Sequence, residues 1–397
     1  MNPAAQRIAV LDYFRGIAIL SVFLFHSVAA AYGYAMLPWS GWFRGFSVSG
    51  SFIPLVPLNI GWIGVPIFFV ISGFCIHVSF ERESRDWGSF YIRRFFRIYP
   101  AYLGALLLFA IFYYPDTNHD LWLQLKNHLL LIHNVDARTF HGIAPAFWTI
   151  AIEAQLYLAY PLLLLLVAKI GWQRTLIALA TCECLIDGWD AAVQTTLGAK
   201  ALFGCQIPSI FWTALPIFHY LKVSPLAYWF SWSIGAFTAD AFLKGRPLPF
   251  VRCSIPLWGL LVIAGYFVRP LSPFFFLISA VLTATVISKF LSGYRPNIRI
   301  PQFCLEHLRK TGVYSYSIYL LHQPLVEMTA KLLSCVSMEV SVHPLLKFSI
   351  CLASWALIMP LGYLWYRAIE KPGIALGKRI IQKMSERKLQ PQRIQNA

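Results

Sequence analysis

Long runs of apolar residues, separated by short polar segments, dominate this chain of 397 residues. An α-helix that crosses the hydrocarbon core of a bilayer needs about 20 mainly apolar residues. Ten stretches of the sequence come close to that length, and they predict an all-α fold, a polytopic bundle of ten transmembrane helices. The predicted spans are residues 15–31, 60–80, 98–114, 146–168, 174–188, 225–243, 253–269, 272–290, 313–333 and 346–366.

Composition and charge agree with a membrane protein. Hydrophobic residues make up 58 % of the chain and charged residues only 13 %, whereas soluble domains carry about 25 % charged residues. A net charge of +16 would suggest nucleic-acid binding in a soluble protein. Here most of the lysine and arginine residues fall in alternate polar segments, as the positive-inside rule describes. We therefore expect a multi-pass protein of the inner (plasma) membrane, with the lipid bilayer as partner, cytoplasmic termini and no nucleic acid.

Two regions do not fit the simple pattern of spans. Residues 189–224 contain an apolar piece broken by prolines. Counting it as a span would put the basic C-terminal end outside, so we interpret it as a re-entrant or surface-lying element. Residues 367–397 are polar and basic, and we expect them to form a cytoplasmic tail that follows a transmembrane domain of residues 1–366.

Four of the predicted helices place a polar side chain near mid-bilayer. At about 1.5 Å per residue, His26 lies roughly 16 Å beyond Arg15, and Ser72, Glu153 and His322 fall at a similar depth. An ionisable group at that depth is costly and usually faces a protein interior or a wet cavity. We expect a shared cavity in which His26 and Glu153 form a base for proton transfer. The alternative for His26 is a structural hydrogen bond between helices.

Arginines and aromatic residues cluster in the polar segment after the second predicted span. Arg93 and Arg97 stand four residues apart, on one face of a helix. Together with Arg94 and Tyr99 they suit a ligand that carries phosphates and a flat base, and Arg15 opens at the same face. The alternative is a basic flank whose side chains reach lipid phosphates.

The predicted outer loop 115–144 is rich in histidine. His119, His128, His133 and His141 are spaced irregularly, which argues against a metal site, and we expect no metal. We interpret the loop as a polar surface that receives a carbohydrate, with an ordinary solvated loop as the alternative.

Six segments in a fixed order carry a more specific pattern. They are Leu11–Gly16 with His26, Phe68–Phe74, Arg93–Pro100, Phe147–Tyr157, Tyr316–Pro324 and Glu370–Pro372. Across nearly the whole chain, this pattern resembles the acyltransferase 3 family of integral-membrane acyltransferases.

The resemblance implies a ten-helix bundle that moves an acyl group, usually acetyl, from cytoplasmic acyl-coenzyme A to a hydroxyl of a cell-envelope carbohydrate. It implies essential roles for Arg15 and His26, donor binding by the arginine cluster and an acidic role for Glu153. The sequence departs from many relatives at Ala154, where they carry a second glutamate.

These observations combine into one hypothesis. An O-acyltransferase binds acyl-coenzyme A at the cytoplasmic face, and His26 acts as general base or briefly carries the acyl group while Glu153 orients it. The expected catalytic residues are Arg15, His26 and Glu153. The expected donor-binding residues are Arg93, Arg94, Arg97 and Tyr99. The expected acceptor-binding residues are Ser72, Trp148, Tyr319 and His322. A transporter of an envelope precursor with a proton relay through His26 and Glu153 is the alternative, and a non-catalytic scaffold is a third possibility.

Overall fold

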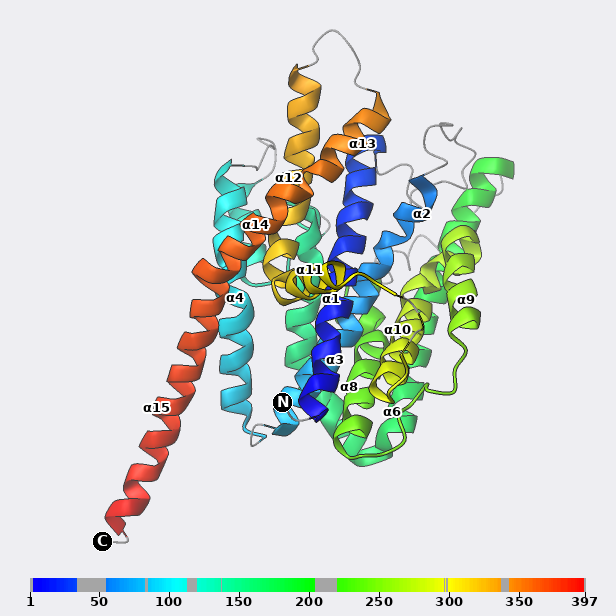
Figure 1. The fold of residues 1–397 in the computed structure, drawn as a ribbon. Helices are drawn as coiled ribbons and strands as arrows, with labels where there is room; N and C mark the ends of the chain where they lie inside the picture. Colours follow the sequence, from blue (N-terminus) through cyan, green and yellow to red (C-terminus); the bar gives the residue numbers. More distant parts are fainter. Residues whose placement is uncertain are drawn as a thin grey trace.

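The computed structural model describes residues 3–33, 55–82, 85–112, 120–136, 138–203, 220–295, 297, 299–336 and 343–395. Every regular element in these residues is a helix. Figure 1 shows most of the helices gathered side by side in one bundle, with the last helix extending beyond it.

The helices follow one another along the chain with short connections. The α-helices are α1 (Pro3–Tyr32), α2 (Val56–Asn59), α3 (Gly64–Arg82), α4 (Trp87–Phe112), α5 (Leu121–Leu129), α6 (Trp148–Phe203), α8 (Trp229–Leu243), α9 (Ile255–Phe267), α10 (Phe275–Leu291), α11 (Gln302–Val313), α12 (Ser315–Val336), α13 (Pro344–Ala353), α14 (Trp355–Trp365) and α15 (Lys371–Gln395). Short 3₁₀ or π-helical turns precede or join several of them, namely η4 (Ile60–Ile63), η5 (Pro145–Phe147), η6 (Pro225–Tyr228), η7 (Arg269–Phe274) and η8 (Tyr366–Glu370).

Local sequence explains where several helices start. Ser224 and Ser254 accept a hydrogen bond on their hydroxyl oxygens from the backbone N–H groups of Leu226 and Leu257, each at 3.3 Å. A proline follows each of these serines within two residues, and proline suits the first helical turn because no partner exists there for its missing N–H. These caps fix the starts of η6 and α9.

Six helical stretches are long and apolar enough to cross a membrane. They are Ala9–Tyr32, Pro57–Arg82, Trp87–Phe112, Pro145–Ala192, Leu271–Leu291 and Pro344–Glu386. The fourth contains two of the predicted spans, because Gly171, with φ 78° and ψ 163°, breaks α6 between them. The predicted spans 225–243, 253–269 and 313–333 also fall on helices, but outside these six stretches. Ten spans and the side of each terminus therefore remain predictions.

The region predicted to be re-entrant is only partly described. α6 stays helical up to Phe203. Residues 204–219, which hold the proline-broken apolar piece, lie outside the described residues. The predicted basic tail coincides with η8 and α15.

Helix α3 lies in the middle of the bundle and touches α8 backbone to backbone. A Cβ atom built on Gly73 would lie 2.0 Å from the carbonyl oxygen of Trp232, and one on Gly235 would lie 1.9 Å from that of Val70. Any side chain at either glycine would clash with the other helix. Small residues at helix interfaces of membrane proteins permit this close approach.

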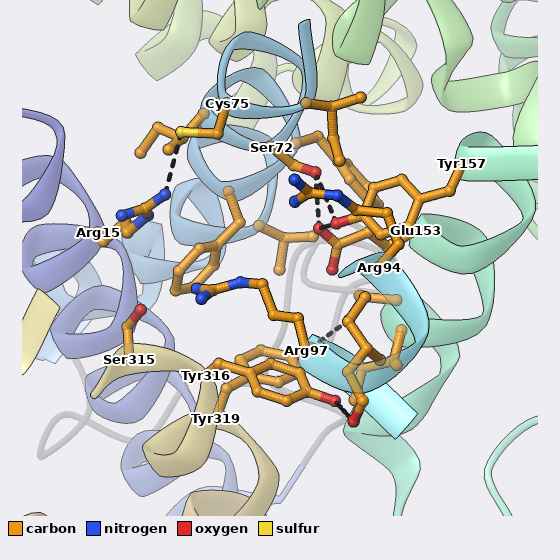
Figure 2. Close-up of a pocket in the computed structure, with 18 residues that line it drawn as sticks. Arg15, Ser72, Cys75, Arg94, Arg97, Glu153, Tyr157, Ser315, Tyr316 and Tyr319 are labelled. Atoms are coloured by element: carbon orange, nitrogen blue, oxygen red, sulfur yellow. Dashed lines mark hydrogen bonds between the residues drawn. The ribbon is translucent and has the colours of Figure 1, made fainter. Parts of the chain in front are cut away.

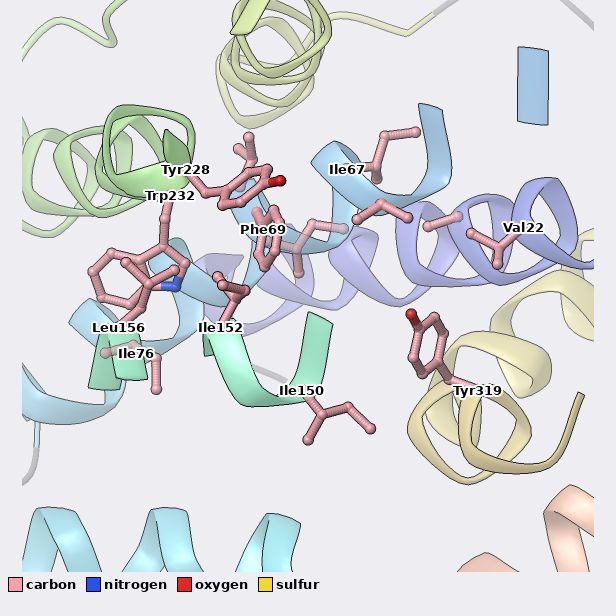
Figure 3. Close-up of a cluster of buried hydrophobic side chains, with 14 of the residues drawn as sticks. Val22, Ile67, Phe69, Ile76, Ile150, Ile152, Leu156, Tyr228, Trp232 and Tyr319 are labelled. Atoms are coloured by element: carbon pink, nitrogen blue, oxygen red, sulfur yellow. The ribbon is translucent and has the colours of Figure 1, made fainter. Parts of the chain in front are cut away.

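Apolar side chains from α3, α6 and α8 fill the space around this contact (Figure 3). Ile76, Ile152 and Leu156 pack there, and the ring of Trp232 is completely buried. The indole N–H of Trp232 donates to the hydroxyl of Ser72 at 3.2 Å. The apolar core therefore also holds one polar side chain at the edge of the site described next.

Candidate active site

His26 and His322 meet between α1 and α12. Nε2 of His322 lies 3.1 Å from Nδ1 of His26, and the two rings pack edge to face with their centroids 4.9 Å apart. His322 is completely buried and His26 is 6 % exposed. The sequence places the two histidines at one depth, and the structure joins them.

The partners of each ring determine which nitrogens carry protons when both rings are neutral. Nδ1 of His322 lies 2.7 Å from the carbonyl oxygen of Tyr319, which can only accept, so Nδ1 is the donor and Nε2 is an acceptor. Nδ1 of His26 lies 2.9 Å from the carbonyl oxygen of Val22, so it too is a donor, shared with Nε2 of His322. Nε2 of His26 therefore keeps its lone pair, as a general base requires.

His26 lines a cavity of about 1820 Å³, which we call the histidine cavity. Aromatic rings make up much of its wall, a lining typical of sites for organic ligands. They belong to Phe25, Trp62, Phe140, Trp148, Tyr228, Tyr266, Phe275, Phe276 and Tyr319.

The charged side chains of the histidine cavity are largely paired. The ammonium group of Lys222 contacts the carboxylate of Asp187 and lies 3.9 Å from that of Asp190. The side-chain amide of Gln323 donates to Glu327 at 2.9 Å. This wall offers hydrogen-bonding groups and aromatic faces rather than a cluster of positive charge.

A second cavity, of about 820 Å³, carries the opposite chemistry (Figure 2). Three guanidinium groups line it, those of Arg15 from α1 and of Arg94 and Arg97 from α4. We call it the arginine cavity. Its other polar lining residues are Ser72, Cys75, Thr149, Glu153, Tyr157, Ser315, Tyr316 and Tyr319.

Two of these arginines are fixed by hydrogen bonds at the cavity wall. Arg15 donates to Asp12 at 2.7 Å and to the sulfur of Cys75 at 3.0 Å. Arg94 donates to the hydroxyl of Ser79 at 2.6 Å. Guanidinium groups held in place in this way match the geometry of phosphate and carboxylate groups.

Arg97 is the most accessible of the three arginines. Its side chain is 40 % exposed and lies 3.9 Å from the buried carboxylate of Glu370. The other oxygen of Glu370 accepts a hydrogen bond from Ser317 at 2.6 Å. The late Glu370–Pro372 segment therefore supports the arginine cavity from α12 and η8.

Glu153 faces the arginine cavity and not His26. One carboxylate oxygen accepts hydrogen bonds from Ser72 at 2.6 Å and from Tyr157 at 2.5 Å. Within the described residues, no hydrogen bond or ion pair joins Glu153 to His26. The expected His26–Glu153 pair is therefore wrong as a contact, because α6 turns Glu153 toward α3 although the depth is similar.

The expected set of donor-binding residues also changes in part. Arg94 and Arg97 line the arginine cavity, whereas Arg93 and Tyr99 are not among its lining residues. The hydroxyl of Tyr99 donates to the carbonyl of Leu129 at 3.0 Å. The expected face of Arg93 and Arg97 is replaced by one formed with Arg94, three residues before Arg97.

The two cavities share part of their walls. Val65 and Tyr319 line both of them, and we call these two residues the partition. The hydroxyl of Tyr319 donates to the carbonyl of Ala146 at 2.9 Å and lies 2.6 Å from the hydroxyl of Thr149. Of the expected acceptor-binding residues, Tyr319 and Trp148 line the histidine cavity, His322 supports His26 and Ser72 lies in the arginine cavity.

Two histidines of the predicted outer loop form a sealed pair instead of a polar surface. His128 and His133 are fully buried, with parallel rings whose centroids are 4.0 Å apart. Burial lowers the pKa of His128 to about 4, and burial and the neighbouring His128 lower the pKa of His133 well below its usual value. His141 instead lines the histidine cavity, and His119 lies outside the described residues.

The structure also identifies site residues that the sequence analysis missed. Val65, Cys75 and Glu327 line the cavities. Glu327 stands four residues after Gln323, one helical turn further along α12, so helical spacing would have placed it beside the histidine layer. Val65 and Cys75 flank the Phe68–Phe74 segment, and only three-dimensional packing distinguishes them. Among the described residues, no group of three or more histidine, cysteine, aspartate or glutamate side chains is placed to hold a metal ion.

The helices and the two internal cavities define a polytopic helical membrane protein with a polar site buried between its helices. The sequence pattern of the acyltransferase domain family matches residues 8–366, and the chain belongs to this family.

Three relatives illustrate the similarity. The chain is 26 % identical over 297 residues to the peptidoglycan O-acetyltransferase OatA of Listeria monocytogenes, covering 69 % of this chain and 46 % of the relative. It is 26 % identical over 347 residues to the O-acetyltransferase OatA of Staphylococcus aureus, covering 76 % and 52 %. It is 26 % identical over 227 residues to the acyltransferase MdmB of Streptomyces mycarofaciens, covering 53 % and 55 %.

The chain thus spans about half the length of these relatives. No solved structure matches it.

Proposed function

We propose that this protein is an O-acyltransferase that moves an acetyl group from acyl-coenzyme A to a hydroxyl of a cell-envelope carbohydrate. One observation carries the proposal. Two cavities of contrasting chemistry share the partition of Val65 and Tyr319, with three arginines on one side and the lone pair of His26 on the other.

The arginine cavity suits the donor. Coenzyme A carries phosphates, and Arg15, Arg94 and Arg97 supply positive charge that only Glu153 opposes within the lining. Charge-assisted hydrogen bonds to phosphate are stronger than neutral ones. With its phosphates at these arginines, the donor extends its thioester toward Tyr319.

The histidine cavity suits the acceptor. Its aromatic walls offer flat apolar surfaces, and its few polar groups can bind hydroxyls, a combination that fits a sugar. The relative from Listeria is named a peptidoglycan O-acetyltransferase, which supports a cell-envelope carbohydrate as the acceptor class.

The reaction needs one proton carrier. Nε2 of His26 removes the proton of the acceptor hydroxyl, and the oxygen attacks the carbonyl carbon of the thioester. The C–O bond of the new ester forms, the C–S bond breaks, and the proton passes from His26 to the leaving thiolate. His322 accepts a hydrogen bond from Nδ1 of His26 throughout and stabilises the imidazolium that forms.

The cellular setting follows from the predicted topology. Acyl-coenzyme A is a cytoplasmic metabolite, so the arginine cavity faces the cytoplasm together with the N-terminus and the basic tail of residues 367–397. The protein is then a multi-pass protein of the inner membrane. Membership of an acyltransferase family favours this function over transport of an envelope precursor.

The first experiment is a single-turnover assay with radiolabelled acetyl-coenzyme A. The purified protein in nanodiscs is mixed with the donor and a soluble N-acetylglucosamine trimer, and label transfer and free thiol are measured. Wild type should release coenzyme A, and His26→Ala should not. His307→Ala is the matched control, since His307 is exposed on α11. Full activity of a folded His26→Ala protein would contradict the proposal.

Donor binding is tested separately. Arg97→Ala should raise the KM for acetyl-coenzyme A by about 10- to 100-fold, as expected when a charge-assisted hydrogen bond is lost, and leave the KM for the acceptor unchanged. Arg309→Ala, an exposed arginine of α11, is the control. An unchanged donor KM in Arg97→Ala would remove the arginine cavity from the donor role.

A further inference from the structure

The partition between the two cavities is narrow and is made of a few named groups. Val65 and Tyr319 line both cavities. Val65 is 3 % exposed and Tyr319 7 % exposed, so both side chains are packed on the sides that do not face a cavity.

The backbone on the Val65 side of the partition cannot recede. The preceding Gly64 is so close to α1 that a Cβ atom there would lie 2.3 Å from the carbonyl oxygen of Ala18. A Cβ on Gly61 would lie 2.1 Å from the carbonyl oxygen of Ser21. The start of α3 is therefore pressed against the backbone of α1 on both sides of one helical turn.

Tyr319 is fixed as well. Its hydroxyl is held by Ala146 and Thr149, and its ring packs edge to face on Phe68 with the centroids 5.8 Å apart. Moving the ring aside would break two hydrogen bonds and one aromatic contact. The width of the partition is therefore set by side-chain volume rather than by a mobile loop.

We propose that Val65, opposite Tyr319, selects the length of the acyl group. This inference rests on the proposed function. At the moment of transfer, the acyl carbon must lie within bonding distance of the donor sulfur in the arginine cavity and of the acceptor oxygen beside His26. That position is the partition, so the methyl end of the acyl group must find room against the Val65 side chain.

Packing energetics give the size of the effect. Adding a methylene to a filled site costs about 1–3 kcal/mol, which corresponds to about a 10- to 150-fold change in rate. Acetyl, with a single methyl group, is the smallest acyl group with a carbon chain. The wild-type protein is therefore expected to use acetyl-coenzyme A best, propionyl-coenzyme A less well and butyryl-coenzyme A least.

The test compares donors of increasing chain length in three variants. For each protein in nanodiscs, kcat/KM is measured by thiol release with acetyl-, propionyl- and butyryl-coenzyme A and the N-acetylglucosamine trimer. Val65→Ala should raise the propionyl-to-acetyl ratio by at least about 10-fold. Val65→Ile should lower that ratio below the wild-type value. Val70→Ala removes the same volume from a buried position of α3 that lines neither cavity, and it should leave the ratio unchanged.

The two Val65 variants shift selectivity in opposite directions, so one of them decides the matter if the other does not fold. Unchanged ratios in a folded Val65 variant, with normal acetyl transfer by wild type, would overturn the inference and leave the proposed function intact. No thiol release by wild type with any of the three donors would instead contradict the proposed function.

Discussion

The protein buries two pairs of histidines, and the pairs differ in how their rings meet. His26 and His322 come from two helices far apart in the sequence and are joined through ring nitrogens 3.1 Å apart. His128 and His133 lie in one connection and stack face to face with centroids 4.0 Å apart. The first pair has one nitrogen at a large cavity, whereas neither ring of the second pair lines either of the two cavities.

The difference shows what separates a reactive histidine from a structural one. Burial is common to both pairs and therefore does not identify function. A base needs an unprotonated nitrogen and a path to the substrate, which only His26 has among these four residues. The stacked pair instead stores a penalty for protonation, because two imidazolium rings at that distance repel each other.

The largest expected effect is on His26. Replacing it with glutamine removes the base, and we expect kcat to fall by about 10²- to 10⁴-fold with little change in Tm. His133→Phe preserves a flat ring in the stacked pair and should keep kcat within about twofold of wild type. Measured kcat values that fall equally in both variants would erase the distinction between the pairs.

A smaller effect is expected for His322, which positions His26. The hydrogen bond from His26 to His322 becomes charge-assisted when His26 takes a proton, and such bonds contribute about 1.5–3 kcal/mol. His322→Ala should therefore lower kcat by about 10- to 100-fold. His322→Gln keeps an acceptor oxygen and should recover part of the loss. Lack of any recovery in a folded glutamine variant would favour a purely structural role for His322.

The stacked pair should control stability against acid. The pKa of His128 is about 4 in the folded protein and about 6.5 in an unfolded chain. The unfolded state therefore binds more protons below pH 6.5, and the stability is complete above that pH and falls as the pH drops toward 4. His128 alone should lower the free energy of unfolding by about 2 kcal/mol at pH 5. Thermal unfolding in detergent at pH 7.5 and pH 5 measures this.

The smallest effect is expected for His133→Phe on that same acid sensitivity. The variant removes one protonation site and the repulsion between the rings, so the fall in Tm between pH 7.5 and pH 5 should become smaller without vanishing. His26→Gln, measured in parallel, shows whether the other pair contributes. A fall in Tm that is identical in wild type and His133→Phe would assign the acid sensitivity to other groups.

The depth of side chains in the bundle could be predicted from the sequence, but their direction around each helix could not. Counting residues from the ends of the helices placed His26 and His322 in one layer, and they are in contact. The same counting placed Glu153 beside them, yet its carboxylate bonds to Ser72 and Tyr157. Depth follows from the rise per residue, whereas direction depends on how neighbouring helices pack.

The arginine cluster shows the same limit over a shorter distance. A spacing of four residues favoured Arg93 with Arg97, and a spacing of three, Arg94 with Arg97, also puts two side chains on one helix face. The pattern alone does not choose between them. The choice is made by contacts with other helices, such as the hydrogen bond from Arg94 to Ser79 on α3.

The loop histidines escaped prediction for a different reason. Residues 115–144 are polar, which is typical of a solvated loop. The fold buries His128 because its Nδ1 donates to the carbonyl of Gln124 at 2.8 Å and Tyr102 of α4 donates to its own carbonyl at 3.0 Å. Such contacts satisfy polar groups internally, and they depend on a partner helix that the loop sequence does not reveal.

The glycine contact between α3 and α8 also limits how the bundle can move. Gly73 and Gly235 leave no layer of side chains between the two backbones. Helices that touch in this way cannot slide past each other without a clash, so α3 and α8 move as one body. Alternating-access carriers work by rocking one group of helices against another, and such motion is blocked at this contact. The two substrates must then reach each other through a static centre, entering from opposite sides without any exchange of inward-facing and outward-facing states.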